Sequence, residues 1–309
     1  MAAAAQEQQL APAQELIRPG LSTVVSRLAD YGELIRPRLN FLVVLTTLIG
    51  FQFGLEGEMP FLGLIHLLLA TALLAGGSSA LNQLIEQDTD ARMRRTQGRP
   101  IPAGRLNSEQ AFVFGMTLSV TGFACLVLAS NWLTAALGAL TWSSYLLAYT
   151  PLKKRTPWAL YIGAVPGALP PVMGWTAAQG HLGLGAVFLF TILFFWQIPH
   201  FLAIALMHRE DYGRAGLPLF PLIDPNLKRT GRHIVFATLA LFGVSAAVAF
   251  CGLAGASYLS AALILGVVFG ALAIACAREK TTLYARYLFL FSIVYLPVLL
   301  ALLAFDKNV

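Results

Sequence analysis

Three oxygen-bearing side chains recur at intervals of four residues in one segment: Asn82, Glu86 and Asp90. A step of four residues turns an α-helix by about 400°, so the three would lie along one helix face, over about 12 Å of its axis. Hard Mg²⁺ prefers such oxygens, and it commonly combines one or two carboxylates with water and substrate phosphates. The spacing therefore predicts a site for a metal-bridged diphosphate.

A group of basic side chains follows this ladder: Arg92, Arg94, Arg95, Arg99 and Arg105. Planar guanidinium groups bind phosphate oxygens through two parallel hydrogen bonds. Carboxylates beside such cations are what a magnesium diphosphate requires. Each single charge is equally well explained as a solvated residue at a helix end, so the prediction rests on the ladder and the arginines together.

Two later segments carry chemistry of the same kind. Tyr149-Thr150-Pro151-Leu152-Lys153 combines a phenol with a cation, and two more cations follow it. Trp196 and His200 lie in an apolar run that precedes His208-Arg209-Glu210-Asp211-Tyr212. A lone histidine in such a run is more often a packing residue than a ligand, and Tyr149 and Trp196 also suit an interfacial position. The structural and the functional interpretation both remain open.

Composition indicates the elements that position these residues. Of the 309 residues, 57% are hydrophobic and 12% are charged, and the mean hydropathy is +0.70. Soluble domains carry about a quarter charged residues, so the polar groups are too few to cover a soluble globule. Continuous apolar runs such as 62–81 and 234–253 indicate helices, because membrane β-strands alternate polar and apolar residues. We expect an all-α integral membrane protein, in which intramembrane polar side chains usually have a function.

Apolar runs of about 20 residues, the length that crosses a bilayer core about 30 Å thick, predict about nine spans. They cover roughly 38–56, 60–86, 108–129, 131–149, 158–178, 183–208, 231–252, 256–277 and 286–305. The fifth and sixth are expected to kink or break at Pro166, Pro170, Pro171 and Pro199. Residues 36–309 then form a single membrane domain, and 1–35 form a disordered cytoplasmic tail.

The distribution of charge predicts the topology. Every Lys and Arg except Lys307 falls in the N-terminal segment or in an even-numbered loop. By the positive-inside rule the N-terminus is cytoplasmic and the C-terminus faces outside. The net charge of +6 is mostly this topology signal, and the scattered cations form no recognisable nucleic-acid-binding module. Because the tail has neither a signal-peptide nor a transit-peptide pattern, we expect a bacterial cytoplasmic (inner) membrane.

The ladder segment also resembles a known motif. Asn82-Gln83-x-x-Glu86-x-Asp88-x-Asp90-x-Arg92-Met93-x-Arg95-Thr96-x-x-Arg99 resembles the first aspartate-rich motif of the UbiA-type intramembrane prenyltransferase superfamily. Its Met-x-Arg-Thr part is similar to the protohaem IX farnesyltransferase (haem O synthase) branch. Segments similar to that branch are also 149–153, 163–175, Trp196-Gln197-x-Pro199-His200-Phe201 and Glu210-Asp211-Tyr212-x-x-Ala215-Gly216-x-Pro218. Relatives that prenylate quinones or chlorophyll carry a second Asp-x-x-x-Asp, where this chain has His208-x-x-x-Tyr212.

The resemblance, which runs from about Arg36 to the end, implies a nine-helix bundle around a central cavity that opens sideways to lipid. It implies transfer of the farnesyl group of farnesyl diphosphate to a vinyl group of haem B, with water adding a hydroxyl, to give haem O for terminal oxidases. Mg²⁺ is the implied cofactor. Farnesyl diphosphate, haem B and the lipid bilayer are the implied partners. The next enzyme of haem A synthesis and a terminal oxidase are candidate protein partners, and no nucleic acid is expected.

The resemblance also implies roles for single residues. The residues that would serve metal ions are Asn82, Glu86 and Asp90 for the first Mg²⁺ and Glu210 and Asp211 for a second. The residues that would bind the metal diphosphate are Asp88, Arg95, Arg99 and Lys153. The ring of Tyr149 would stabilise the allylic cation through its face. His200 would contact haem, through either iron or propionate.

Two other functions remain open from the sequence. Prenylation of an aromatic quinone precursor would use the same diphosphate chemistry. A multi-pass carrier of an anionic solute would also need intramembrane polar residues. Carriers place their site near the midplane and often show inverted repeats, whereas the polar residues here gather at one face and no such repeat is visible.

Overall fold

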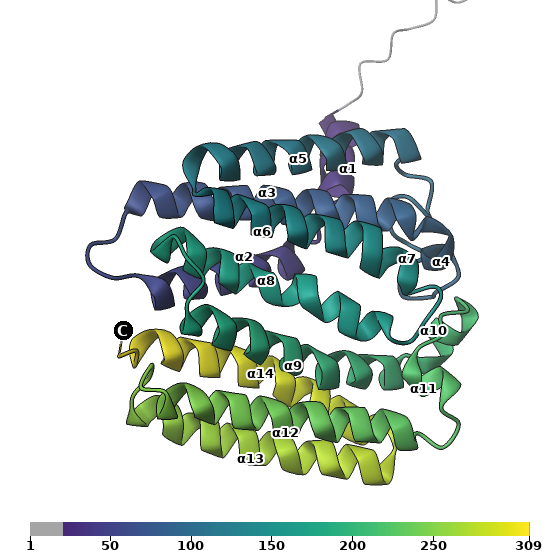
Figure 1. Cartoon of the computed structure of the whole chain (residues 1–309). Coiled ribbons are helices and arrows are strands. Elements are labelled where there is room, and N and C mark those ends of the chain that lie inside the picture. Colours follow the sequence, from purple (N-terminus) through teal and green to yellow (C-terminus); the bar gives the residue numbers. More distant parts are fainter. Residues whose placement is uncertain (1–20, 309) are drawn as a thin grey trace, which may run out of the picture.

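The computed structural model describes residues 21–308, and for 21–24 it describes the backbone without side chains. The named elements in this part are all helices (Figure 1). The long helices are α1 (Leu21–Leu34), α2 (Pro37–Gly54), α3 (Phe61–Ile85), α5 (Ser108–Ala129), α6 (Trp132–Ser143), α8 (Ala159–Gln179), α9 (Leu184–Met207), α12 (Lys228–Phe250), α13 (Ala256–Glu279) and α14 (Thr282–Phe305). The short ones are α4 (Gln87–Ala91), the π-helix η1 (Ser144–Tyr149), α7 (Thr150–Leu152), α10 (Arg209–Arg214) and α11 (Phe220–Ile223).

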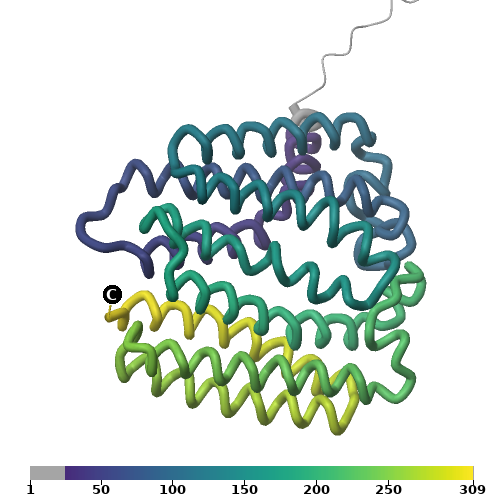
Figure 2. The backbone as a smooth tube through the Cα atoms, in the orientation of Figure 1, coloured from purple at the N-terminus to yellow at the C-terminus, as the bar shows by residue number. Residues whose placement is uncertain are grey.

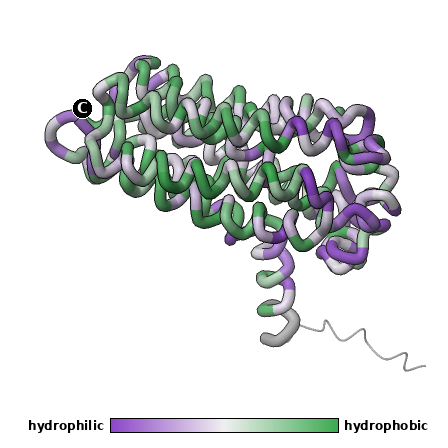
Figure 3. Tube along the Cα trace, turned by 90° about the horizontal axis from the view of Figure 1, so that it is seen from below, coloured by the Kyte–Doolittle hydropathy of each residue, from purple (hydrophilic) through white to green (hydrophobic). Residues whose placement is uncertain are grey.

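The helices α2 to α14 run roughly side by side in one bundle, as the ribbon and the smooth trace both show (Figures 1 and 2). The short elements α4, α7, α10 and α11 gather at one end, and the C-terminus lies at the other. The same end as the short elements carries most of the hydrophilic residues (Figure 3). The loops that follow the second, fourth and sixth expected spans therefore meet at one end of the bundle, as the charge distribution predicts.

The expected all-α membrane architecture is confirmed, and the chain is a multi-pass membrane protein. In the described part, six helices are individually long and apolar enough to cross a membrane: α3, α5, α9, α12, α13 and α14. A seventh results if α1 and α2, bent by 50° to each other, form one span. The count of nine is not confirmed, because α2, α6 and α8 are not among the helices that are individually long and apolar enough to cross, and α6 ends after 12 residues in a π-helix.

Glycines allow the helices that hold the polar end to approach closely. A β-carbon at Gly50 of α2 would lie 1.9 Å from the carbonyl oxygen of Pro171 in α8, and one at Gly174 would lie 2.0 Å from that of Thr47. Between α3 and α5, a β-carbon at Gly77 would lie 2.3 Å from Ser119 Oγ. Small residues are the usual means of helix contact in lipid, where burial of apolar surface gives little driving force.

Two expectations need correction at the level of single helices. The prolines do not break the fifth and sixth helices, since α8 is continuous through Pro166, Pro170 and Pro171 and α9 through Pro199. Neighbouring helices and local adjustments can satisfy the carbonyl groups that such prolines leave free. Within the segment 1–35, for which a disordered tail is expected, residues 21–34 form α1; residues 1–20 lie outside the described part.

Candidate active site

The polar ladder lies where α3 gives way to α4. Glu86 has φ −93° and ψ 4° and ends α3, so the three ladder residues are not on one uninterrupted helix as predicted. This bridge conformation is sparsely populated and is common at active sites. The backbone N–H of Glu86 still donates to the carbonyl of Asn82 over 2.9 Å, and that of Asp90 to Glu86 over 2.8 Å. The helical register therefore continues through the break and keeps the three residues in sequence along one side.

Each ladder side chain is buried and has a partner from elsewhere in the chain. Glu86, 4% exposed, accepts a hydrogen bond from Lys153 Nζ over 2.9 Å. Asp90, 1% exposed, pairs through Oδ2 with Arg99 Nη1 over 2.5 Å. The Asn82 amide donates to Thr150 Oγ1 over 3.1 Å. These contacts bring together residues that are 67 positions apart (Glu86 and Lys153) and 68 positions apart (Asn82 and Thr150). The predicted residues therefore lie together, while their roles stay predictions.

The π-helix η1 brings Tyr149 and Lys153 to the ladder. Tyr145 and Tyr149 stack with ring centroids 5.6 Å apart, and Thr150 Oγ1 donates to the carbonyl of Tyr145. A β-carbon at Gly163 of α8 would lie 2.5 Å from the ring of Tyr149, so glycine there makes room for the phenol. Lys153 Nζ lies 5.9 Å from the centroid of the same ring. Single-turn π-helices of this kind are frequent at functional sites.

The charges of this cluster hold both partners of the Glu86–Lys153 pair ionised. Burial raises the pKa of Glu86, but Lys153, by its charge and its hydrogen bond, and the charges of Arg36 and Arg99 outweigh burial and leave that pKa below its ordinary value. For Lys153, burial lowers the pKa, and Tyr149 and Glu86 together raise it well above its ordinary value. The pair stays charged at neutral pH.

Two polar groups of the cluster have atoms left over. Asp90 Oδ1 is buried and accepts no hydrogen bond from any described residue. Nε and Nη2 of Arg36 are also buried, and neither donates a hydrogen bond to any described residue. Buried polar atoms are nearly always satisfied, and those of a charged group are the costliest to leave unpaired. A free carboxylate oxygen and free guanidinium N–H groups in one cluster suit a ligand that carries both a cation and an anion.

Other predicted site residues lie outside this cluster. Asp88 is exposed, on the short helix α4. Arg95 donates to Tyr212 Oη over 3.4 Å and lies 5.8 Å from the centroid of that ring, at the surface. On α10, Glu210 is exposed and Asp211 pairs with Arg214. The described contacts do not join Glu210 and Asp211 to the ladder, although Arg95 and Tyr212 link the two loops that carry them.

His200 lies in the C-terminal half of α9, toward the polar end of the bundle, and contacts α14. Its Nδ1 is 2.7 Å from Ser292 Oγ, and its ring stacks on Trp196 with centroids 4.7 Å apart. The ring of Phe289 in α14 also lies beside the imidazole, with the two ring centroids 5.1 Å apart. His200 is therefore held by aromatic and polar contacts, and no described contact joins it to the ladder.

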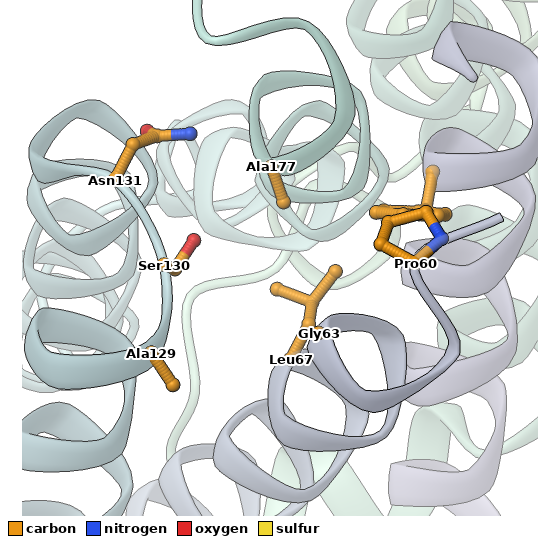
Figure 4. A pocket seen from close by; sticks show the side chains of 8 residues that line it. Pro60, Gly63, Leu67, Ala129, Ser130, Asn131 and Ala177 are labelled. Atoms are coloured by element: carbon orange, nitrogen blue, oxygen red, sulfur yellow. The ribbon is translucent and has the colours of Figure 1, made fainter. Parts of the chain in front are cut away.

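A pocket at the far end of α3 is separate from all of these residues. It has a volume of about 280 Å³ and is lined by Phe51, Pro60, Gly63, Leu67, Ala129, Ser130, Asn131 and Ala177 (Figure 4). Pro60 immediately precedes α3, whereas Glu86 follows its last residue. A helix of 25 residues is about 37 Å long, so this pocket lies at the opposite end of the bundle from the polar cluster.

Comparison with known proteins identifies the fold and the family. The sequence profile of the UbiA prenyltransferase family matches residues 43–305. The chain belongs to this family. A relative from Solibacter usitatus (strain Ellin6076), named protoheme IX farnesyltransferase, is 44% identical over 287 residues, which cover 90% of this chain and 98% of the relative. The prenyltransferase activity that names the family makes the chain a membrane-embedded prenyltransferase.

Solved structures agree on the fold. The structure of a digeranylgeranylglyceryl phosphate synthase is similar, with a TM-score of 0.76 at 16% identity, and the match covers 91% of this chain and 98% of that one. A UbiA homologue from Archaeoglobus fulgidus, solved with GPP and Mg²⁺, has a TM-score of 0.58 at 17% identity, over 89% of this chain and 99% of that one. At these identities the comparison shows a common UbiA fold.

Sequence reasoning missed three residues of this UbiA-family site: Arg36, Tyr145 and Thr150. Tyr145, Tyr149 and Lys153 repeat the interval of four that marks the ladder, so a second stripe was readable in the sequence. Arg36 carried no such signal. It has φ 48°, an unusual left-handed conformation for a residue with a side chain, at the joint between α1 and α2.

The cluster fits the metal that the family resemblance implies. Among the described residues, no group of three or more His, Cys, Asp and Glu side chains is arranged to hold an ion by itself. One or two carboxylates with an amide, completed by water and phosphate oxygens, are nonetheless a common Mg²⁺ environment. The unpartnered Oδ1 of Asp90 is an oxygen ligand with an open side, which supports this fit.

Proposed function

We propose that the chain transfers the farnesyl group of farnesyl diphosphate to a vinyl group of haem B, giving haem O for haem-copper terminal oxidases. The C1–O bond of the farnesyl diphosphate breaks and diphosphate leaves; one vinyl carbon bonds to C1, and water adds its hydroxyl to the other vinyl carbon and releases a proton. The name and 44% identity of the Solibacter usitatus relative support these substrates. The observation that carries the diphosphate half of the reaction is the buried cluster in which Asp90 Oδ1 and Arg36 Nε and Nη2 form no hydrogen bond with any described residue.

In this function the diphosphate binds at the polar end of α3. Arg36 donates its free N–H groups to diphosphate oxygens, and Arg99 and Lys153 add positive charge where negative charge develops on the leaving group. Asn82 is held by Thr150, so its amide oxygen is oriented before substrate arrives. Arg95 and Asp88 are placed at the exposed rim, where they steer the metal diphosphate toward the cluster.

Mg²⁺ would be held by Asn82, Glu86 and Asp90, and it would neutralise leaving-group charge as a Lewis acid. The Archaeoglobus fulgidus homologue with GPP and Mg²⁺ supports a metal diphosphate in this fold. Glu86 is paired with Lys153 and Asp90 with Arg99, and a bound metal diphosphate would replace these pairings at least in part. Glu210 and Asp211, both on α10, would serve a second ion.

The ring of Tyr149 would stabilise the allylic cation after ionisation, since an aromatic face attracts a cation. Its stacking on Tyr145 and the space left by Gly163 fix that face. The surrounding apolar helices exclude water until the vinyl group has attacked. His200 would contact haem through its iron or a propionate.

The same proposal includes the finer architecture. All nine expected spans coincide with helices of the structure, and we propose that α6 with η1, and α8, cross the membrane as well, around a central cavity open to lipid. The positive-inside rule supports a cytoplasmic N-terminus and a C-terminus outside. The proposed location is the bacterial inner membrane. A terminal oxidase or the next enzyme of haem A synthesis would receive the product.

The proposed reaction is tested by offering acceptors in parallel. Purified protein with Mg²⁺ and farnesyl diphosphate is incubated with haem B or with 4-hydroxybenzoate, and products are analysed by mass. Haem O in the first reaction and no product in the second is the expected result. A prenylated benzoate would replace the proposal by the quinone alternative. Uptake of an anionic solute into proteoliposomes, without product in either reaction, would support the carrier.

A further inference from the structure

Ser292 of α14 holds two aromatic residues of α9 at once. Its hydroxyl oxygen is 2.7 Å from His200 Nδ1, and its backbone carbonyl accepts a hydrogen bond from Trp196 Nε1 over 2.8 Å. The side chain is fully buried. Trp196 in turn stacks on the imidazole, with an angle of 23° between the rings. One residue therefore fixes both the position and the tilt of His200.

Counting hydrogens at Ser292 determines the tautomer of His200. The hydroxyl has one hydrogen, and it is donated to the carbonyl of Phe289, 2.6 Å away. With that hydrogen on the Phe289 carbonyl, the hydroxyl oxygen accepts from His200, which assigns the imidazole N–H to Nδ1. A neutral imidazole with the proton on one nitrogen has a lone pair on the other. Nε2 of His200 thus has a lone pair that can ligate a metal, and no described residue donates a hydrogen bond to it.

We propose that Ser292 is a positioning residue that locks His200 as the Nδ1–H tautomer, so that Nε2 ligates the iron of the haem substrate. Histidine ligands of metals usually donate their second N–H to a neighbouring oxygen, which sets ring orientation and increases basicity. The Ser292 hydroxyl provides that oxygen, and Trp196 and Phe289 cover the ring. This inference rests on haem B as the acceptor and selects iron over propionate as the atom that His200 meets.

The test compares haem B with iron-free protoporphyrin IX, both titrated into the purified full-length protein and followed by absorption. In the Ser292→Ala protein, the affinity for haem B should fall about 10- to 100-fold with a shifted Soret band, as is typical for loss of such a partner. The affinity for protoporphyrin IX should stay the same, because no iron is ligated. A merely structural role of Ser292 would weaken both or neither.

Ser245→Ala is the matched control. Ser245 is also fully buried and is 3.0 Å from an aromatic hydroxyl, that of Tyr295, but it does not contact His200. Its haem spectrum and affinity should equal those of the unmodified protein. If Ser292→Ala does not fold, Ser292→Cys retains the volume with a weak acceptor, and the same selective loss of haem B affinity is expected.

The outcomes separate this inference from the proposed function. If the unmodified protein forms haem O and His200→Ala loses the iron-dependent spectrum while Ser292→Ala and Ser292→Cys retain it, the role of Ser292 is overturned. If His200→Ala retains it too, iron ligation by His200 is overturned. If the unmodified protein neither binds nor farnesylates haem B, the proposed function fails, and the inference falls with it.

Discussion

Replacing Arg36 by Gln should separate substrate binding from stability. Two nitrogens of this guanidinium are buried without acceptors, and its charge attracts Glu86 but repels Arg99. When no diphosphate is added, these two effects oppose each other, so Arg36→Gln should change the melting temperature by no more than about 2 °C, less than a loss of about 1 kcal/mol would cause. The diphosphate, by contrast, loses a charged donor.

The expected loss of activity follows from that donor. A hydrogen bond to a charged group contributes roughly 1.5–3 kcal/mol, and about 1.4 kcal/mol corresponds to a factor of ten. Arg36→Gln should therefore lower kcat/KM for farnesyl diphosphate about 10- to 150-fold. Magnesium pyrophosphate should raise the melting temperature of the unmodified protein, and Arg36→Gln should abolish that rise.

Arg99→Gln is the contrasting variant. It removes the partner of Asp90, which is 1% exposed, and breaking a buried ion pair in this way typically costs about 3–5 kcal/mol of folding free energy. This variant should lose both stability and activity, whereas Arg36→Lys, which retains the charge without the planar fork, should lose part of the activity alone. An Arg36→Gln protein that unfolds early but turns over normally per folded molecule would refute the reasoning.

Three further results are expected. Glu86→Gln should abolish farnesyl transfer but leave haem B binding intact, because the carboxylate serves the metal diphosphate; full activity at limiting Mg²⁺ would contradict this. The folded-state pKa of Glu86 lies below its ordinary value of 4.5, so its contribution to stability is present above that pH and is lost as pH falls through the lowered pKa. The melting-temperature difference between the unmodified and Glu86→Gln proteins should therefore be constant from pH 7 to about 5 and shrink below, and a decline already near pH 6 would argue against the ion pair. In a background with the exposed Cys251 changed to Ser, cysteines at the exposed positions Gln97 and Gly213 should react with a thiol reagent from the cytoplasmic side and one at Glu58 from outside; labelling of all three from one side would overturn the topology.

The site could be predicted in part because its signals are local. An interval of four residues between Asn82, Glu86 and Asp90 survives in the structure, since the backbone hydrogen bonds continue across the break at Glu86. The break itself, and the π-helix that brings Tyr149 to the cluster, were not predicted. Both depend on backbone conformations that neighbouring helices impose, and apolar periodicity does not encode them.

The role of Arg36 shows a different limit. In the sequence, Arg36 precedes Pro37 and is one of the cations of the N-terminal segment that the positive-inside rule explains. Arg36 lies at the joint where α1 and α2 bend by 50°, and in the folded chain its charge acts on Glu86 and Arg99. The sequence shows the charge of Arg36, and the tertiary structure determines which groups lie near it.

The sequence by itself determined the class of protein, because too few charged residues for a soluble surface and long apolar runs have one common solution, helices in a bilayer. It also determined that an oxygen ladder and arginines lie at one end of a helix. The pairings Glu86–Lys153 and Asp90–Arg99, and the contact of His200 with Ser292, were decided by tertiary structure. In a membrane helix both the lipid-facing and the inward-facing sides are apolar, so hydrophobic pattern does not reveal which side turns inward. That choice is made by close contacts such as those at Gly50, Gly163 and Gly174, which exist only when the helices are packed.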